Sequence, residues 1–208
     1  MNMEQKHKVF ISYHHANDQF YKEKLLEFNE NHDIFIDKSV DTGDIDDNLS
    51  DENIRTKIRD EYLNDSTVTI VLVGTETWCR KHIDWEIYSS MYDGTVNKKS
   101  GILVVNLPST GSDKVTAGHG SEEKRLIHSG VTSWTSLDKA GYDKRYPHMP
   151  ERIIDNLSAN NAKISVVLWS LIENDSEKLR TLIDFTSKDR QSAEYDLSRS
   201  MRRQNCNN

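Results

Sequence analysis

The chain has 208 residues and a formal net charge of −7, and 29% of its residues are charged. This length is sufficient for one sizeable core, so we expect one domain followed by a C-terminal extension. The acidic balance disfavours nonspecific binding to DNA or RNA, because their phosphates would be repelled.

Compartment and membrane association can be judged from the cysteines and from the lengths of the apolar runs. The cysteines Cys79 and Cys206 form no CxxC pair and no disulfide framework, which fits a reducing compartment. The first apolar run, residues 9–11, is too short for a signal peptide. No stretch approaches the roughly 20 apolar residues that span a membrane. We therefore expect a soluble, cytoplasmic protein with no nucleic-acid or membrane partner.

Apolar runs of strand length alternate with segments of helical periodicity. We predict strands at residues 8–13, 33–37, 68–73, 100–107 and 162–169, and helices at 19–31, 51–63, 78–91, 151–159 and 175–186. Residues 121–146 are ambiguous, with a short helix at 122–128 as one interpretation. The first helix has Asn17 or Asp18 as its candidate cap. This alternation predicts a central, mostly parallel five-stranded sheet covered by helices on both faces, which is a three-layer α/β sandwich.

Three segments fall outside this pattern. Residues 38–52 form a long acidic loop whose spacing does not match a calcium loop, so we expect a solvated loop and no metal site. Residues 108–150 are interpreted as an insertion in an α/β domain that spans residues 1–187. We predict that residues 188–208 form a C-terminal helix or a disordered tail.

Ligands of parallel sheets bind beyond the carboxyl ends of the strands. This rule puts His14, His15, residues 74–78 and Asn106 on the candidate rim. Since His14 and His15 are adjacent, they point to opposite sides, and at most one should face a ligand. The chain lacks the phosphate-loop, dinucleotide, zinc-protease and nucleophile-elbow motifs.

The helix after residue 77 carries a carboxylate at the edge of its apolar stripe. Helical spacing puts Glu86 beside that stripe, in a ridge with Trp78 and His82, and directs Asp84 toward solvent. One interpretation is a functional carboxylate held in a fixed orientation. The other is a boundary glutamate paired with a basic side chain, and spacing alone favours this plainer interpretation.

Three stretches resemble a known family. The segments KVFISYHHAND, IRDEYLNDSTVTIVLVGTETWCRKHIDWEI and GILVVNL are similar to the TIR-like domains of bacterial antiphage Thoeris systems. The resemblance covers residues 8–107, and its most specific parts are a strand ending in SYH and the pattern strand–GxxTxxRxxxxxEI.

The resemblance implies a flavodoxin-like fold and an enzyme that consumes NAD⁺ as its substrate, without a cofactor or metal. Such an enzyme cleaves the nicotinamide–ribose bond and makes a cyclic ADP-ribose isomer that activates a separate effector protein, and it can form a homo-oligomer on activation. The matching catalytic residue is Glu86. Substrate-binding residues would be Ser12, Tyr13, His14, Thr77, Trp78 and His82.

One departure from the broader TIR pattern concerns the spacing after Trp78 and Cys79. Many TIR domains have a glutamate three residues after that cysteine, whereas His82 occupies this position here and Glu86 lies one helical turn further. The alternative hypothesis is a non-catalytic TIR-like module for protein interaction or nucleotide sensing.

Overall fold

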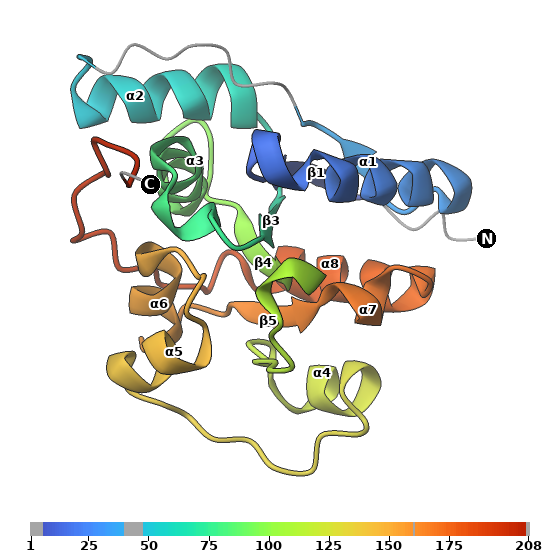
Figure 1. Ribbon diagram of the computed structural model, residues 1–208. Coiled ribbons are helices and arrows are strands. Elements are labelled where there is room, and N and C mark those ends of the chain that lie inside the picture. Colours follow the sequence, from blue (N-terminus) through green and yellow to red (C-terminus); the bar gives the residue numbers. More distant parts are fainter. Residues whose placement is uncertain (1–5, 40–47, 160, 207–208) are drawn as a thin grey trace.

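A computed structural model describes residues 6–39, 48–159 and 161–206 of the chain. Its sheet has five strands, β1 (Lys8–Ser12), β2 (Ile36–Asp37), β3 (Val68–Val73), β4 (Gly101–Asn106) and β5 (Ser165–Leu168). They lie in the order β2-β1-β3-β4-β5, and every neighbouring pair is parallel (Figure 1). The predicted flavodoxin-like sandwich is thus confirmed.

The helices occupy both faces of this sheet. They are α1 (His15–His32), α2 (Asp51–Lys57) continued by the π-helix η1 (Ile58–Leu63), the 3₁₀ turns η2 (Thr77–Cys79) and η3 (Pro108–Thr110), α3 (Lys81–Met91), α4 (Gly120–Ile127), α5 (Lys139–Arg145), α6 (Glu151–Leu157), α7 (Trp169–Ile172) and α8 (Ser176–Asp189). Three of them, η3, α5 and α7, were not predicted. The last strand also ends one residue earlier than expected, because Trp169 begins α7.

Alternating strand residues supply a separate core on each face. Helices α1, α7 and α8 pack on one side, where Leu25 and Leu182 meet the inward residues of β1, β3 and β4. On the other side α3, α5 and α6 form a second core, and α2 with Trp85 of α3 forms a third over Phe10. The strands β3 and β4 are buried along their whole length, which explains their continuous apolar sequence.

The first helix begins earlier than its sequence indicates. His14 occupies the N-cap position without a side-chain capping bond, and α1 starts at His15, where we had predicted a start near residue 19. The expected cap residue Asp18 lies in the first turn, with its side chain buried. This side chain is buried because it packs against the turn after β3.

Residues 190–206 run as irregular chain along the α3 and α6 side of the molecule, where the red segment is visible in Figure 1. This described part of the predicted tail contains no helix, and it is anchored by buried Ala193 and Met201. The amide of Asn156 on α6 also donates to the carbonyl of Asp196 and accepts from its N–H. The division of the chain at residues 187 and 188 stays a prediction.

Three further predictions concern the acidic loop, membrane-spanning segments and metal sites. Residues 40–47 of the acidic loop lie outside the described residues. In the part of the chain that is described, no helix is long and apolar enough to cross a membrane. Within those same ranges, no three His, Cys, Asp or Glu side chains are grouped so as to hold a metal ion.

Candidate functional site

The carboxylate of Glu86 lies against the carboxyl end of β1. The Ser12 hydroxyl donates a hydrogen bond of 2.7 Å to Glu86 Oε2. Ser12 is fully buried and Glu86 is only 4% exposed, so this carboxylate lies deeper than the boundary position that helical spacing predicted. A buried carboxylate is costly unless polar groups hold it, and a fixed hydrogen bond also sets its orientation.

This contact follows from strand alternation and from the stripe of α3. Phe10 packs with α2 and α3, so Ser12, two residues further along β1, projects to the same face. On α3, Ile83 and Ile87 bury their side chains against β3 and β4, which brings the adjacent Glu86 over β1. The sequence brings these two residues together across 74 positions.

Residues 74–80 form a tight turn between β3 and α3. Thr77 Oγ1 accepts from the Gly74 N–H at 2.8 Å and donates to Asp18 Oδ2 at 3.4 Å. A Cβ atom on Gly74 would lie 2.4 Å from Asp18 Oδ1, so any larger residue would force the Asp18 side chain to shift. Burial raises the pKa of Asp18, while the hydrogen bond from Thr77 acts in the opposite direction. Thr77 is 1% exposed, and its hydroxyl shapes this turn. Its role in substrate binding stays a prediction.

The expected ridge of three side chains on one helix is wrong for Trp78. Arg80 is extended, with φ −96° and ψ 121°, so Trp78 belongs to the separate turn η2 and α3 begins only at Lys81. The indole is 39% exposed. It lines a small hollow of about 160 Å³ together with Arg80 and Arg202. Asp84 also lines this hollow, whereas Glu86 does not.

The remaining predicted site residues are distributed over both faces of the sheet. Tyr13 packs into the core under α1 and donates to Gln19 Oε1 at 2.6 Å, so it lies on the opposite face from Ser12. His14 lies at the rim with its Nδ1 4.0 Å from Glu76 Oε2. Burial, Arg80 and His15 lower the pKa of His14. His82 is half-buried and packs edge-to-face against Trp85, with their ring centroids 4.9 Å apart.

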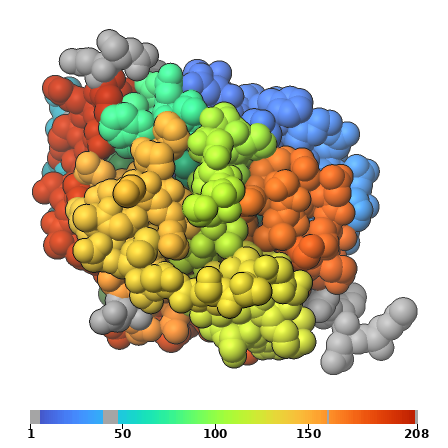
Figure 2. Space-filling model, turned by 60° about the horizontal axis from the view of Figure 1, so that its bottom comes forward, coloured from blue at the N-terminus to red at the C-terminus, as the bar shows by residue number. Residues whose placement is uncertain are grey.

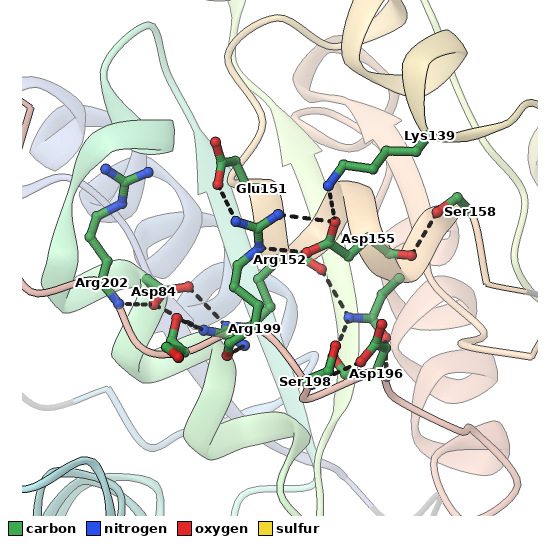
Figure 3. Close-up of polar contacts among 12 residues, drawn as sticks. Asp84, Lys139, Glu151, Arg152, Asp155, Ser158, Asp196, Ser198, Arg199 and Arg202 are labelled. Atoms are coloured by element: carbon green, nitrogen blue, oxygen red, sulfur yellow. Dashed lines mark hydrogen bonds and ion pairs between the residues drawn. The ribbon is translucent and has the colours of Figure 1, made fainter.

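Asp84 is a second buried carboxylate of α3, where helical spacing had placed it toward solvent. Arg152 of α6 donates to both of its oxygens, at 2.8 and 3.1 Å, and is itself fully buried (Figure 3). The N–H of Arg202 donates to Asp84 Oδ2 at 2.8 Å. This network fixes the side of α3 that faces away from β1 and attaches residues 199–202 to it.

One residue of the site was missed by sequence reasoning. Ser39 follows β2, and its hydroxyl accepts from the Ile11 N–H at 3.1 Å. The beginning of the acidic loop therefore returns to β1, one residue before Ser12. Its only sequence signal is its position just after a strand, which does not distinguish it from other loop serines.

The fold and this geometry define a flavodoxin-like α/β domain in which a helix after the third strand holds a buried glutamate at the end of the first. That arrangement is typical of TIR-like domains. Residues 10–112 match the family model described as Thoeris protein ThsB, TIR-like domain, and this part of the chain belongs to that antiphage defence family. The match extends from β1 to just beyond β4. The comparison with curated proteins found no match.

Proposed function

We propose that this TIR-like protein cleaves the nicotinamide–ribose bond of NAD⁺ and closes the ADP-ribose into a cyclic isomer, which acts as a messenger in antiphage defence. Three findings support the proposal: membership of residues 10–112 in the Thoeris family, the parallel sheet, and a buried glutamate at the expected edge. The partners of this function are NAD⁺, a separate effector reached through the messenger, and further copies of the chain assembled on activation. The cytoplasm, where NAD⁺ is available, is the proposed compartment.

In the proposed reaction Glu86 acts on the ribose. The bond between the anomeric carbon and the nicotinamide nitrogen breaks, and its electron pair leaves with neutral nicotinamide. A carboxylate near the anomeric carbon stabilises the positive charge that develops there, as carboxylates do in glycoside cleavage. A nucleophile of the same ADP-ribose then attacks that carbon and loses a proton. The balanced products are nicotinamide, cyclic ADP-ribose isomer and H⁺.

The observation that carries this proposal is the hydrogen bond between Ser12 and Glu86. It joins two of the three stretches that resemble the family, at the end of β1 and on helix α3, with 2.7 Å between the Ser12 hydroxyl and Glu86 Oε2. A carboxylate removed from water acts more strongly on a nearby developing charge than a solvated one. Ser12 would then be a positioning residue, since its hydroxyl orients the carboxylate.

The test is incubation with NAD⁺, followed by chromatography for nicotinamide and mass spectrometry for cyclic products. We expect Glu86→Gln to reduce nicotinamide release at least about 100-fold, the scale of losing one charge-stabilising group. Ser12→Ala should reduce it roughly tenfold, since one hydrogen bond to the carboxylate is lost. Glu30→Gln, an exposed glutamate on α1, is the matched control and should keep the wild-type rate. Melting temperatures establish that each variant folds.

The same assay is repeated over a range of protein concentrations, so that an active site completed by self-assembly would also be detected. Lysates of phage-infected cells, which would contain the activated protein, are assayed in the same way. Undiminished product with Glu86→Gln would overturn the role of Glu86. Absence of nicotinamide release by the wild type under every one of these conditions would reject the enzyme and favour the protein-interaction alternative.

A further inference from the structure

A cavity of about 530 Å³ opens beside the end of β4, away from the Ser12–Glu86 contact. Its walls are the carboxyl end of β4, the segment 110–114, and α5 with the turn that follows it at residues 145–149. Figure 2 shows the segment after β4, in yellow-green, running between the α5–α6 region and the α7–α8 region. The volume lies within the range of about 300–1,000 Å³ that is usual for small-molecule sites.

This cavity and the candidate active site flank the same turn. Strand β3 lies between β1 and β4, so Ser12 and Asn106 end strands on either side of it. The turn 74–80 follows β3. His148, which lines the cavity, contacts the Thr75 carbonyl through Nδ1 at 3.0 Å. A ligand in this cavity would therefore contact residues different from those around Glu86.

Asn106 at the end of β4 has an unusual side chain. The residue is 4% exposed, lines the cavity, and its Nδ2 has no hydrogen-bond partner among the described residues. Since Ile102 and Val104 pack on the α3, α5 and α6 face, strand alternation directs Asn106 to that same face. A buried amide donor without a partner is unfavourable and calls for an explanation. A ligand acceptor in the cavity would supply one.

The charge of the cavity is positive, although the chain as a whole is acidic. Three cations line it against one carboxylate, and Lys114 pairs locally with Asp113 at 3.0 Å. Lys144 and Arg145 form no ion pair in residues 6–39, 48–159 and 161–206. Both lie at the end of α5, and the Arg145 guanidinium also lies over the Tyr142 ring, 5.9 Å from its centroid. Neither charge is neutralised by a carboxylate in those ranges, so both can receive an anion. Arginine and lysine side chains are the common ligands of phosphate groups.

We propose that this cavity binds a small phosphorylated ligand of nucleotide size, at a site separate from that of the proposed reaction. Lys144 and Arg145 hold the phosphate, and Asn106 Nδ2 donates to an acceptor on the body of the ligand. The side chains of Leu137 and Met149 pack against its apolar part. The proposal does not depend on NAD⁺ cleavage, because the cavity residues lie across the turn 74–80 from Ser12 and Glu86.

Calorimetric titration of the full chain with AMP, adenosine and inorganic phosphate tests this proposal. We expect AMP to bind, and the double variant Lys144→Ala/Arg145→Ala to weaken it at least about tenfold, because each charge-assisted bond contributes on the scale of a tenfold change. The matched control Lys98→Ala/Lys188→Ala removes the same charge from exposed positions and should leave AMP affinity unchanged. Adenosine and phosphate should each bind more weakly than AMP.

A second variant separates ligand binding from folding. Asn106→Leu removes the unpartnered donor, so we expect the melting temperature of the free chain to rise while AMP affinity falls. A lower melting temperature of Asn106→Leu would show that the Asn106 amide stabilises the fold. That result would overturn its assignment as a ligand-binding group. The proposal is also refuted if the wild type binds no AMP, or if phosphate alone binds as tightly as AMP. It is refuted too if Glu86→Gln abolishes AMP binding while Lys144→Ala/Arg145→Ala leaves it intact, because AMP would then bind at the site around Glu86.

Discussion

Replacing Arg152 by alanine tests how the end of the chain is attached to α3. Arg152 is fully buried, and its guanidinium donates to both oxygens of Asp84. It also donates to the carbonyls of Arg199 and Ser200, at 3.0 and 3.2 Å. In the native chain only 10% of the Asp84 side chain is exposed, and the substitution removes the cation paired with it.

The expected loss follows from that burial. Breaking a buried pair by removing one partner costs about 3–5 kcal/mol, because an uncompensated charge remains. This is a large fraction of a total stability of about 5–15 kcal/mol. Arg199 provides the matched control, since it also pairs with acids on α6 but its side chain is 32% exposed. Its replacement by alanine should cost about 1 kcal/mol or less.

Urea unfolding followed by circular dichroism measures both losses, and hydrogen exchange should show reduced protection in residues 199–206 of the Arg152→Ala variant. Replacing the pair by apolar side chains, with Asp84→Leu and Arg152→Met together, should recover part of the stability. A loss below about 1 kcal/mol for Arg152→Ala would refute the reasoning, as would a double variant less stable than Arg152→Ala alone.

Two further predictions concern the rim of the sheet. Gly74→Ala should lower the free energy of unfolding by about 1–3 kcal/mol, because its Cβ would overlap the Asp18 carboxylate. The control Gly130→Ala, with no atom within 4 Å of the new Cβ, should change it by about 0.5 kcal/mol or less. Equal effects in thermal or urea unfolding would contradict the packing argument. Because the pKa of His14 is lowered in the folded chain, its neutral form is favoured there, and stability should fall as pH decreases through the unfolded histidine pKa of about 6.5. His14→Gln should reduce that fall in urea midpoints measured between pH 8 and 5, and a variant with the wild-type pH dependence would show that His14 does not contribute.

The central strands β3 and β4 were predictable because their buried residues form continuous apolar runs in the sequence. In β3 and β4 every residue is buried, and a run of apolar side chains is sufficient to indicate this. The position of Glu86 beside the buried stripe could also be inferred from helical period. Its hydrogen bond to Ser12 could not, because the partner lies 74 residues away.

Two of the errors share one physical cause, which is that distant partners override the local pattern. Asp84 was assigned to solvent because helical spacing contains no information about Arg152, 68 residues later in the chain. Asp18 was taken for a helix cap, whereas Thr77 and Gly74 determine where its side chain lies. The start of α3 was set too early, since the extended backbone of Arg80 separates it from η2.

The position of β5 in the chain has a consequence for biosynthesis. The part that matches the family ends at residue 112, whereas the strand that pairs with β4 begins at Ser165. About 50 residues must be translated between them, which takes roughly 3–10 s at ribosomal rates. During that interval the buried apolar strand β4 has an open edge on the nascent chain, and such edges pair readily with other chains. A chaperone that shields this edge would therefore raise the yield of folded protein more than one that acts after release from the ribosome.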